Sequence, residues 1–272
     1  MEFNAMKRLH GVGYPVPAVL LVGGEDSPFG KPFILMERID GKTLWSFMFQ
    51  PETKNKQQLL DQFCGLVVQL HNHDWRAVAV DTFDYDEKDP YQFVDQWLQS
   101  AWDQLERLEL NSFDDTFKWL QDRRDSVPCT RPAVIHYDFH PNNILIKEDG
   151  SAVVIDWSNI DISDPRFDLA WTMLLVGSYE SSAWRNRILE SYERQAGSHI
   201  QELAFFDVSA CSRRLASILA SLGGRADELG MDPNAVDLIR QQMPAHKRVY
   251  DLLLERTGIH IPEIESVFVE FS

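Results

Sequence analysis

Two predicted β-hairpins constrain the fold of this chain most strongly, because they interrupt a sequence whose periodicity is otherwise helical. The first joins the apolar runs 16–24 and 31–39 through a turn-rich segment. The second joins 144–146 to 153–155, with an Asp-Gly pair in the turn between them. A two-stranded hairpin buries little surface by itself. The first hairpin, even with the short helix before it, must therefore pack on another part of the chain.

Apolar residues recur at helical spacing through most of the remaining chain. The predicted helices cover residues 2–10, 57–71, 91–105, 113–124, 166–177, 181–196, 199–222 and 233–256. A short apolar run at 133–136 predicts one more strand. The sequence has no repeat, no low-complexity segment and no Pro/Gly-rich linker, so Asp40–Gly41 is the best candidate for a hinge.

The composition is that of a folded globular protein, with 272 residues of which 44% are hydrophobic and 25% charged. A formal net charge of −16 disfavours nucleic acids and anionic membranes as partners. Cys64, Cys129 and Cys211 are too far apart for a zinc or disulfide motif, and we expect three small buried side chains in a reducing cytoplasm. No apolar run reaches the roughly 18 residues of a membrane span, and the N-terminus lacks the pattern of a secretion signal.

The densest group of polar residues is the stretch 136–143, which directly precedes the second hairpin. The hairpin returns Asp156 to the loop that carries Asp138 and Asn143, so two carboxylates and an amide are expected in one small volume. A carboxylate and an amide oxygen suit Mg²⁺, while nucleotide phosphates complete its coordination. A second carboxylate can accept the proton of an attacking hydroxyl. The spacing of Asp138 and Asn143 matches the acid–amide pair of kinase catalytic loops, so this set favours phosphoryl transfer.

Other interpretations of these residues are structural or metal-binding. Asp138 and Asn143 are common turn formers, and Asp156 can cap the segment that follows it. In an extended segment, His136, Asp138 and His140 would share a face and could hold zinc or iron. The separate cluster at 71–74 closes a predicted helix, where histidines more often complement the helix dipole than bind metal.

Three ordered motifs carry a resemblance to a known family: H-x-D-x-x-x-x-N from His136, I-D-W from Ile155, and D-P-x-x-D-L-A from Asp164. With these motifs the chain resembles the aminoglycoside phosphotransferase and choline kinase-like family. The resemblance implies a protein kinase-like, two-lobed α+β fold. Residues 1–40 would be a remnant of the small lobe, with a helix, a β-hairpin and the hinge. Residues 41–272 would form the helical C-terminal lobe with the catalytic loop and the substrate region.

The resemblance also implies a role for each site residue. Asp138 would be the catalytic base, and Asn143 and Asp156 would bind Mg²⁺. The adenine of ATP would bond to backbone of the lobe connector, formed by Met36, Glu37, Arg38 and Ile39. Among supporting residues, His136 would brace the loop and Asp168 would hold it from behind, although Asp168 also suits the start of a helix as a dipole complement. Glu2 occupies the position of the glutamate that pairs with a phosphate-binding lysine.

The resemblance leaves two function classes open. The first is an ATP-dependent kinase that phosphorylates a hydroxyl of a small molecule such as an aminoglycoside, a macrolide or an amino alcohol. The second is a catalytically silent, kinase-like binding protein, because the family's glycine-rich loop and phosphate-binding lysine have no counterpart before Glu2. We therefore expect a truncated small lobe. Trp157 and Trp171 are aromatic candidates for the acceptor pocket, but their spacing favours the core.

Overall fold

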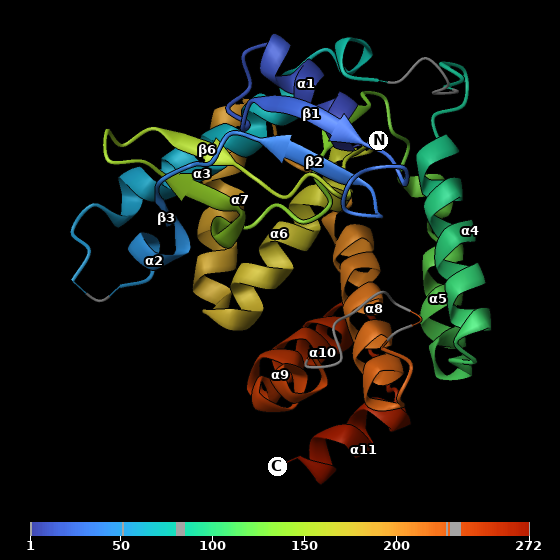
Figure 1. The fold of residues 1–272 in the computed structure, drawn as a ribbon. Helices are drawn as coiled ribbons and strands as arrows, with labels where there is room; N and C mark the ends of the chain where they lie inside the picture. The colour runs from blue at the N-terminus through green and yellow to red at the C-terminus, as the bar shows by residue number, and fades with distance from the viewer. Residues whose placement is uncertain (1, 51, 80–84, 227, 229–234, 272) are drawn as a thin grey trace. The chain divides into compact units, whose positions relative to one another are not determined.

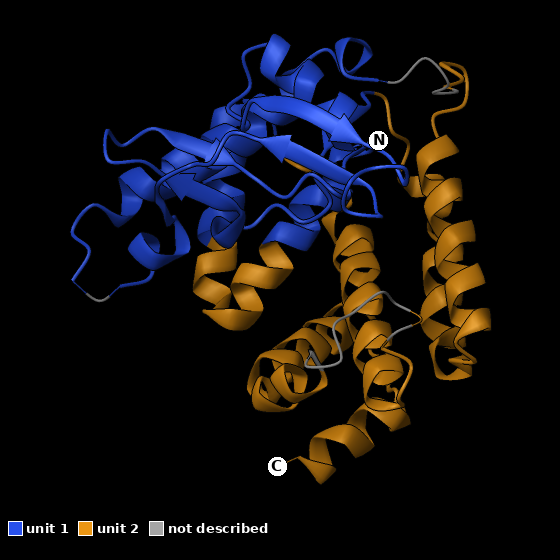
Figure 2. Cartoon of the chain, in the orientation of Figure 1, with its two compact units in different colours: residues 1–84, 131–172, 187–198 blue, residues 85–130, 173–186, 199–272 orange. Residues whose placement is uncertain are grey.

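The computed structural model describes residues 2–50, 52–79, 85–226, 228 and 235–271. The chain forms two compact units, coloured separately in Figure 2. Unit 1 comprises residues 1–84, 131–172 and 187–198, and unit 2 comprises residues 85–130, 173–186 and 199–272. The boundary expected at residue 40 between a small and a large lobe came from the family resemblance, and it stays a prediction.

Unit 1 contains all the described strands, arranged in three small antiparallel sheets (Figure 1). The strand order is β1-β2 in the first sheet, β3-β5-β6 in the second and β4-β7 in the third. The strands are β1 (Val19–Gly23), β2 (Phe33–Met36), β3 (Lys42–Thr43), β4 (Ala133–Ile135), β5 (Ile144–Ile146), β6 (Ala152–Val154) and β7 (Asp161–Ser163). Both hairpins expected from the sequence are confirmed, whereas the short strands β3 and β7 were not predicted.

The helices of unit 1 pack with buried side chains. They are α1 (Glu2–Gly11), α2 (Trp45–Met48), α3 (Lys56–Asn72), the first part of α6 (Pro165–Tyr179) and the second part of α7 (Ser182–Ala196). Helix α6 is buried along almost its whole length. After α1 the chain turns through Gly13, and the carbonyl of Pro15 accepts a hydrogen bond from the Val154 amide over 2.8 Å. The N-terminal segment is therefore bonded directly to the second hairpin.

Strand β3 is added to the second hairpin through a close backbone approach at Gly41. A Cβ at this position would lie 2.7 Å from the carbonyl oxygen of Ile146, which is closer than real side chains come. Glycine permits the approach because it has no side chain. Lys42 then pairs with Ile146, and Thr43 pairs with Leu145. The segment proposed as a hinge thus leads straight into the sheet that follows the catalytic loop.

The described part of unit 2 contains helices and loops but no strand. Its helices are α4 (Gln92–Arg107), α5 (Asp114–Gln121), α8 (Leu203–Leu222), α9 (Ala235–Gln241), α10 (Met243–Thr257) and α11 (Pro262–Glu270), with the ends of α6 and α7. Helices α4 and α5 lie side by side (Figure 1), and the rings of Trp102 and Phe117 are 4.8 Å apart between centroids. Helix α8 is buried along most of its length, and α10 packs against it.

The prediction of one helix over 233–256 was wrong. The structure has α9 and α10 instead, with the break at Gln242, and residues 233 and 234 lie outside the described residues. Pro244 explains the break, because proline has no amide hydrogen and its ring clashes with the carbonyl four residues earlier. The same residue is tolerated in the first turn of α10.

The remaining expectations about the core are confirmed. The three cysteines are free and buried. Trp157 and Trp171 are buried as well.

None of the helices in the described part of the chain is both long enough and apolar enough to cross a bilayer.

Candidate active site

The candidate catalytic loop begins where β4 ends at Ile135. Tyr137 has a left-handed backbone conformation, with φ at 63°. A short 3-10 helix, Pro141–Asn143, ends the loop and leads into β5. Residues other than glycine adopt this conformation at a cost, and it persists only where the surroundings hold it. The turn at Tyr137 therefore needs a support, which helix α6 supplies.

Asp168 holds the backbone of this loop. Its Oδ2 accepts a hydrogen bond from the His136 amide over 2.9 Å, and its Oδ1 accepts one from the Tyr137 amide over 3.0 Å. The Nε2 atom of His71 lies 3.2 Å from Oδ2. Asp168 has no exposed surface, so these bonds satisfy a carboxylate that water cannot reach.

Asp138 lies on the loop with its carboxylate fixed by two neighbours. The indole Nε1 of Trp171 donates to Oδ1 over 2.9 Å, and Nε2 of His140 lies 3.5 Å from Oδ2. Burial alone would raise the pKa of Asp138, but the hydrogen bond and charge of His140, followed by the bond from Trp171, lower it to about 2. The side chain remains 31% exposed. Asp138 is thus an ionised carboxylate with a fixed orientation and an open side.

Asn143 connects the loop to the second hairpin. Its side-chain Nδ2 donates to the backbone carbonyl of Asp138 over 3.0 Å. The backbone carbonyl of Asn143 accepts a hydrogen bond from the amide of Ile155 over 2.9 Å, and Ile155 directly precedes Asp156. The amide nitrogen is therefore turned toward the loop, which leaves the side-chain carbonyl oxygen as the group that can bind a cation.

Asp156 follows β6 in a left-handed conformation, with φ at 65°. Aspartate tolerates this conformation better than most residues. The side chain is exposed, and its Oδ1 accepts a hydrogen bond from Ser158 over 2.9 Å. The turn at Asp156 thus leaves its carboxylate exposed to solvent, one residue after the backbone bond to Asn143.

His136 is enclosed between the loop and the hairpin. Its Nε2 lies 3.0 Å from the carbonyl of Ile155, and its ring packs on Trp157 with 4.6 Å between centroids. Trp157 in turn donates from Nε1 to the carbonyl of Val154 over 2.9 Å. These contacts place His136 inside the structure, and its expected role as a brace stays a prediction that the geometry suits.

The proposed adenine-binding segment follows β2. The Glu37 amide donates to the carbonyl of Ala18 over 2.7 Å, and the Ala18 amide donates to the Glu37 carboxylate over 3.2 Å. Arg38 is almost fully exposed, and Met36 and Ile39 flank this pair in the chain. Glu2 lies in the first turn of α1 and is half-buried. The roles predicted for these five residues stay predictions.

The alternative metal site formed by His136, Asp138 and His140 receives no support. In the described residues no group of three or more His, Cys, Asp or Glu side chains converges as a metal site would require. Nε2 of His136 lies 3.0 Å from the Ile155 carbonyl instead.

Sequence reasoning missed three residues that act on the loop: His71, Trp171 and Tyr192. His71 was expected to complement a helix dipole, but it is buried between Asp168 and Tyr192. Trp171 was expected in the core, with the acceptor pocket as the alternative, and it also donates to Asp138. The spacing of Asp168 and Trp171, three positions apart on one helix, was the available signal, because such residues share a face.

Solved structures that align with this chain include phosphotransferases and kinases. A Ralstonia eutropha protein described as an aminoglycoside phosphotransferase aligns with a TM-score of 0.68 at 18% identity. The alignment covers 95% of this chain and 82% of that one. A choline/ethanolamine kinase family protein of Mesorhizobium loti aligns with a TM-score of 0.54 at 18% identity, covering 99% and 81%. An aminoglycoside phosphotransferase in ternary complex with ADP and hygromycin B aligns with a TM-score of 0.52 at 18% identity, covering 92% and 82%. The expected kinase-like α+β fold is confirmed.

The chain belongs to the Phosphotransferase enzyme family, which matches residues 1–206. Among curated proteins it is 26% identical over 213 residues to acyl-CoA dehydrogenase family member 11 of Rattus norvegicus, an alignment that covers 74% of this chain and 25% of the relative. The chain thus spans about a quarter of the length of that relative.

Proposed function

We propose that this chain transfers the γ-phosphoryl group of ATP to a hydroxyl of a small molecule. The observation that carries the proposal is the Asp138 carboxylate, which is ionised, oriented by two side chains and still partly open to solvent. Phosphoryl transfer depends mostly on positioning and charge, because its transition state is loose. A carboxylate of low pKa suits such a reaction, since it orients the hydroxyl and accepts its proton late.

The donor set fits a hard divalent cation. Asn143 would offer its side-chain oxygen and Asp156 its exposed carboxylate, and both are ligands that Mg²⁺ prefers. When bound, Mg²⁺ would neutralise phosphate charge on the nucleotide. The hydrogen bond from the Ile155 amide to the backbone carbonyl of Asn143, one residue before Asp156, supports a site shared by these two residues. Met36, Glu37, Arg38 and Ile39 would contact the adenine, and His136, Asp168 and Glu2 would support the site.

The acceptor class is proposed on chemistry alone. Aminoglycosides and amino alcohols are cationic, and a net charge of −16 favours cations near the protein. Macrolides belong to the same proposed range of hydroxyl-bearing acceptors. A cytoplasmic location remains a prediction.

The test is an assay of ATP-dependent phosphoryl transfer to a panel of aminoglycoside, macrolide and amino-alcohol acceptors. Transfer is measured as ADP release and as the mass increase of the acceptor. Asp138→Asn should reduce transfer by about 10²–10⁴-fold while the fold survives. Asp149→Asn is the matched control, since this exposed carboxylate lies in the hairpin turn, and its transfer rate should match that of the wild type. Nucleotide binding without transfer to any acceptor would instead identify a silent binding protein, and normal turnover in Asp138→Asn would contradict the assigned base.

A further inference from the structure

A chain of hydrogen bonds inside unit 1 leads from helix α7 to the candidate catalytic loop. The hydroxyl of Tyr192 lies 2.8 Å from Nδ1 of His71, and Nε2 of His71 lies 3.2 Å from Oδ2 of Asp168. All three side chains are buried. Because water does not reach them, each polar atom depends on the others for a partner.

The chemistry of the three groups fixes where the protons are. Asp168 accepts bonds from two backbone amides, so the His71 nitrogen that faces it must donate. A neutral imidazole has one N–H, which leaves Nδ1 as an acceptor. Burial, and then the charge of Asp168, raises the pKa of Tyr192, so its hydroxyl stays protonated. The hydroxyl can therefore donate a hydrogen bond to Nδ1 of His71.

We infer that Tyr192 is a positioning residue for the catalytic loop, because its hydroxyl, together with the Asp168 carboxylate, holds the His71 ring in the orientation and tautomer that donates to Asp168. The inference rests on the proposed function in so far as the loop is catalytic. Without the hydroxyl, His71 can place its proton on Nδ1 and turn a lone pair toward the Asp168 carboxylate. Asp168 then loses one of its fixed donors, while it has to hold Tyr137 in a left-handed conformation.

The variant Tyr192→Phe isolates the hydroxyl. The ring of Tyr192 packs edge-on against His71, with 5.8 Å between centroids, and phenylalanine keeps that packing. Tyr250→Phe is the matched control, because Tyr250 is also buried and its hydroxyl donates to Glu265 in unit 2. Both variants remove one buried phenol hydroxyl, but only the first removes a partner of His71.

The primary experiment measures hydrogen exchange of the His136 and Tyr137 amides and the ¹⁵N shifts of the His71 ring. In Tyr192→Phe we expect exchange of both amides to be about three- to tenfold faster, as for the loss of one hydrogen bond. The ¹⁵N shifts should show an increased share of the Nδ1–H tautomer. Tyr250→Phe should change neither. In the transfer assay, kcat of Tyr192→Phe should fall by a similar factor, with KM for nucleotide unchanged.

A double-mutant cycle with His71→Gln separates this role from simple packing. Glutamine has a side-chain N–H₂ for Asp168 but no tautomer, so Tyr192→Phe should change exchange less than about twofold in that background. Equal acceleration in both backgrounds, or an unchanged His71 tautomer in Tyr192→Phe, would overturn the inference. If the protein transfers no phosphate, the proposed function fails, yet exchange and tautomer still decide the role of Tyr192.

Discussion

The indole of Trp171 donates a hydrogen bond to the Asp138 carboxylate, with Nε1 and Oδ1 2.9 Å apart. Trp171 lies three residues after Asp168 on α6, and Thr172 donates from Oγ1 to the carbonyl of Phe139 over 2.7 Å. The helix is itself anchored at its start, where Asp164 Oδ1 accepts from the Arg166 amide over 2.9 Å. One helix thus fixes both the backbone of the loop and the side chain of its acidic residue.

Trp171→Phe should therefore impair transfer without impairing nucleotide binding. The substitution removes one of the two side chains that orient Asp138, and the pKa of this carboxyl should rise from about 2 toward its ordinary 3.8. We expect kcat to fall about tenfold, as for the loss of a hydrogen bond to a charged group, with KM for nucleotide nearly unchanged. Steady-state kinetics and an NMR titration of Asp138 measure the two effects. Trp119→Phe, on α5, is the control, and a similar loss there would point to general destabilisation.

The low pKa of Asp138 also predicts how stability depends on pH. The folded-state pKa of about 2 is below the ordinary 3.8, so the carboxylate stabilises the folded state at pH values above about 4. That contribution should be lost as the pH falls from about 4 to about 2. Urea unfolding of wild type and Asp138→Asn between pH 2 and 6 measures it as a difference in the free energy of unfolding. A difference that persists unchanged at pH 2 would contradict the assigned direction.

Local sequence patterns were enough to predict most of the fold. The second hairpin followed from its Asp-Gly turn, and helix α3 followed from apolar residues on one face. The patterns failed where a single proline decided the outcome, as at Pro244. They also failed for β3 and β7, which are too short for a periodicity and exist only because distant strands pair with them.

In the candidate site, too, local sequence motifs identified some residues and missed those that distant elements contribute. Asp138, Asn143 and Asp156 stand close together in the sequence, so a local motif and one hairpin suggested that they act together. The groups that hold them, such as His71 and Tyr192, come from helices far away in the chain. A histidine at the end of a helix gives no local sign that it will face a buried carboxylate, because the packing of whole elements determines its partner.

Asp156→Asn should weaken nucleotide binding only when magnesium is present. The exposed carboxylate would lose its charge while keeping an oxygen, and a neutral oxygen binds a hard cation less well. We expect the Kd for Mg·ATP to rise at least about tenfold and the Kd for ATP in EDTA to stay the same, since only the first depends on the metal. Isothermal titration measures both, and the shift of Tm with ligand checks them by mass action. Glu148→Gln removes an exposed charge beside the hairpin turn and should leave both values unchanged; an unaltered Mg·ATP affinity in Asp156→Asn would exclude it as a ligand.

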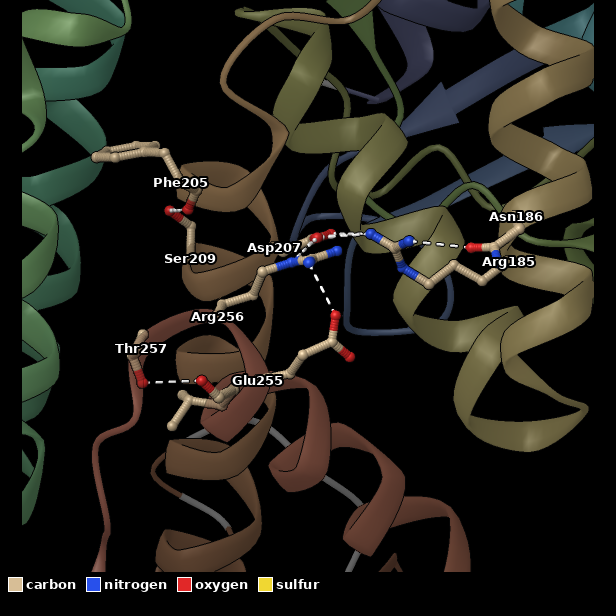
Figure 3. Close-up of polar contacts among 9 residues, drawn as sticks. Arg185, Asn186, Phe205, Asp207, Ser209, Glu255, Arg256 and Thr257 are labelled. Carbon is tan, nitrogen blue, oxygen red and sulfur yellow. Dashed lines mark hydrogen bonds and ion pairs between the residues drawn. The ribbon is translucent and has the colours of Figure 1, made fainter.

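Unit 2 contains a buried ion network centred on Asp207. Asp207 on α8 accepts from Arg185 over 2.7 Å at Oδ1, and its Oδ2 accepts from Arg256 over 2.9 Å (Figure 3). Arg256 also donates to Glu255 over 2.9 Å. Asp207 is buried. The network links the part of α7 in unit 2 to α8 and α10, and the Asp207 carboxylate bonds to two guanidinium groups.

Asp207→Asn should destabilise the protein more strongly than the loss of any exposed ion pair. Removing one partner of a buried pair leaves the opposite charge uncompensated, which costs about 3–5 kcal/mol of unfolding free energy. The matched control is Asp237→Asn, because Asp237 pairs with Arg240 over 3.2 Å at the surface, with 74% of the Asp237 side chain exposed. That substitution should cost less than about 1 kcal/mol. Urea unfolding of both variants gives the comparison, and equal costs would show that the Asp207 network contributes no more than a surface contact. Because Arg185, Asp207 and Arg256 bond to one another within unit 2, folded Asp207→Asn should keep its affinity for Mg·ATP.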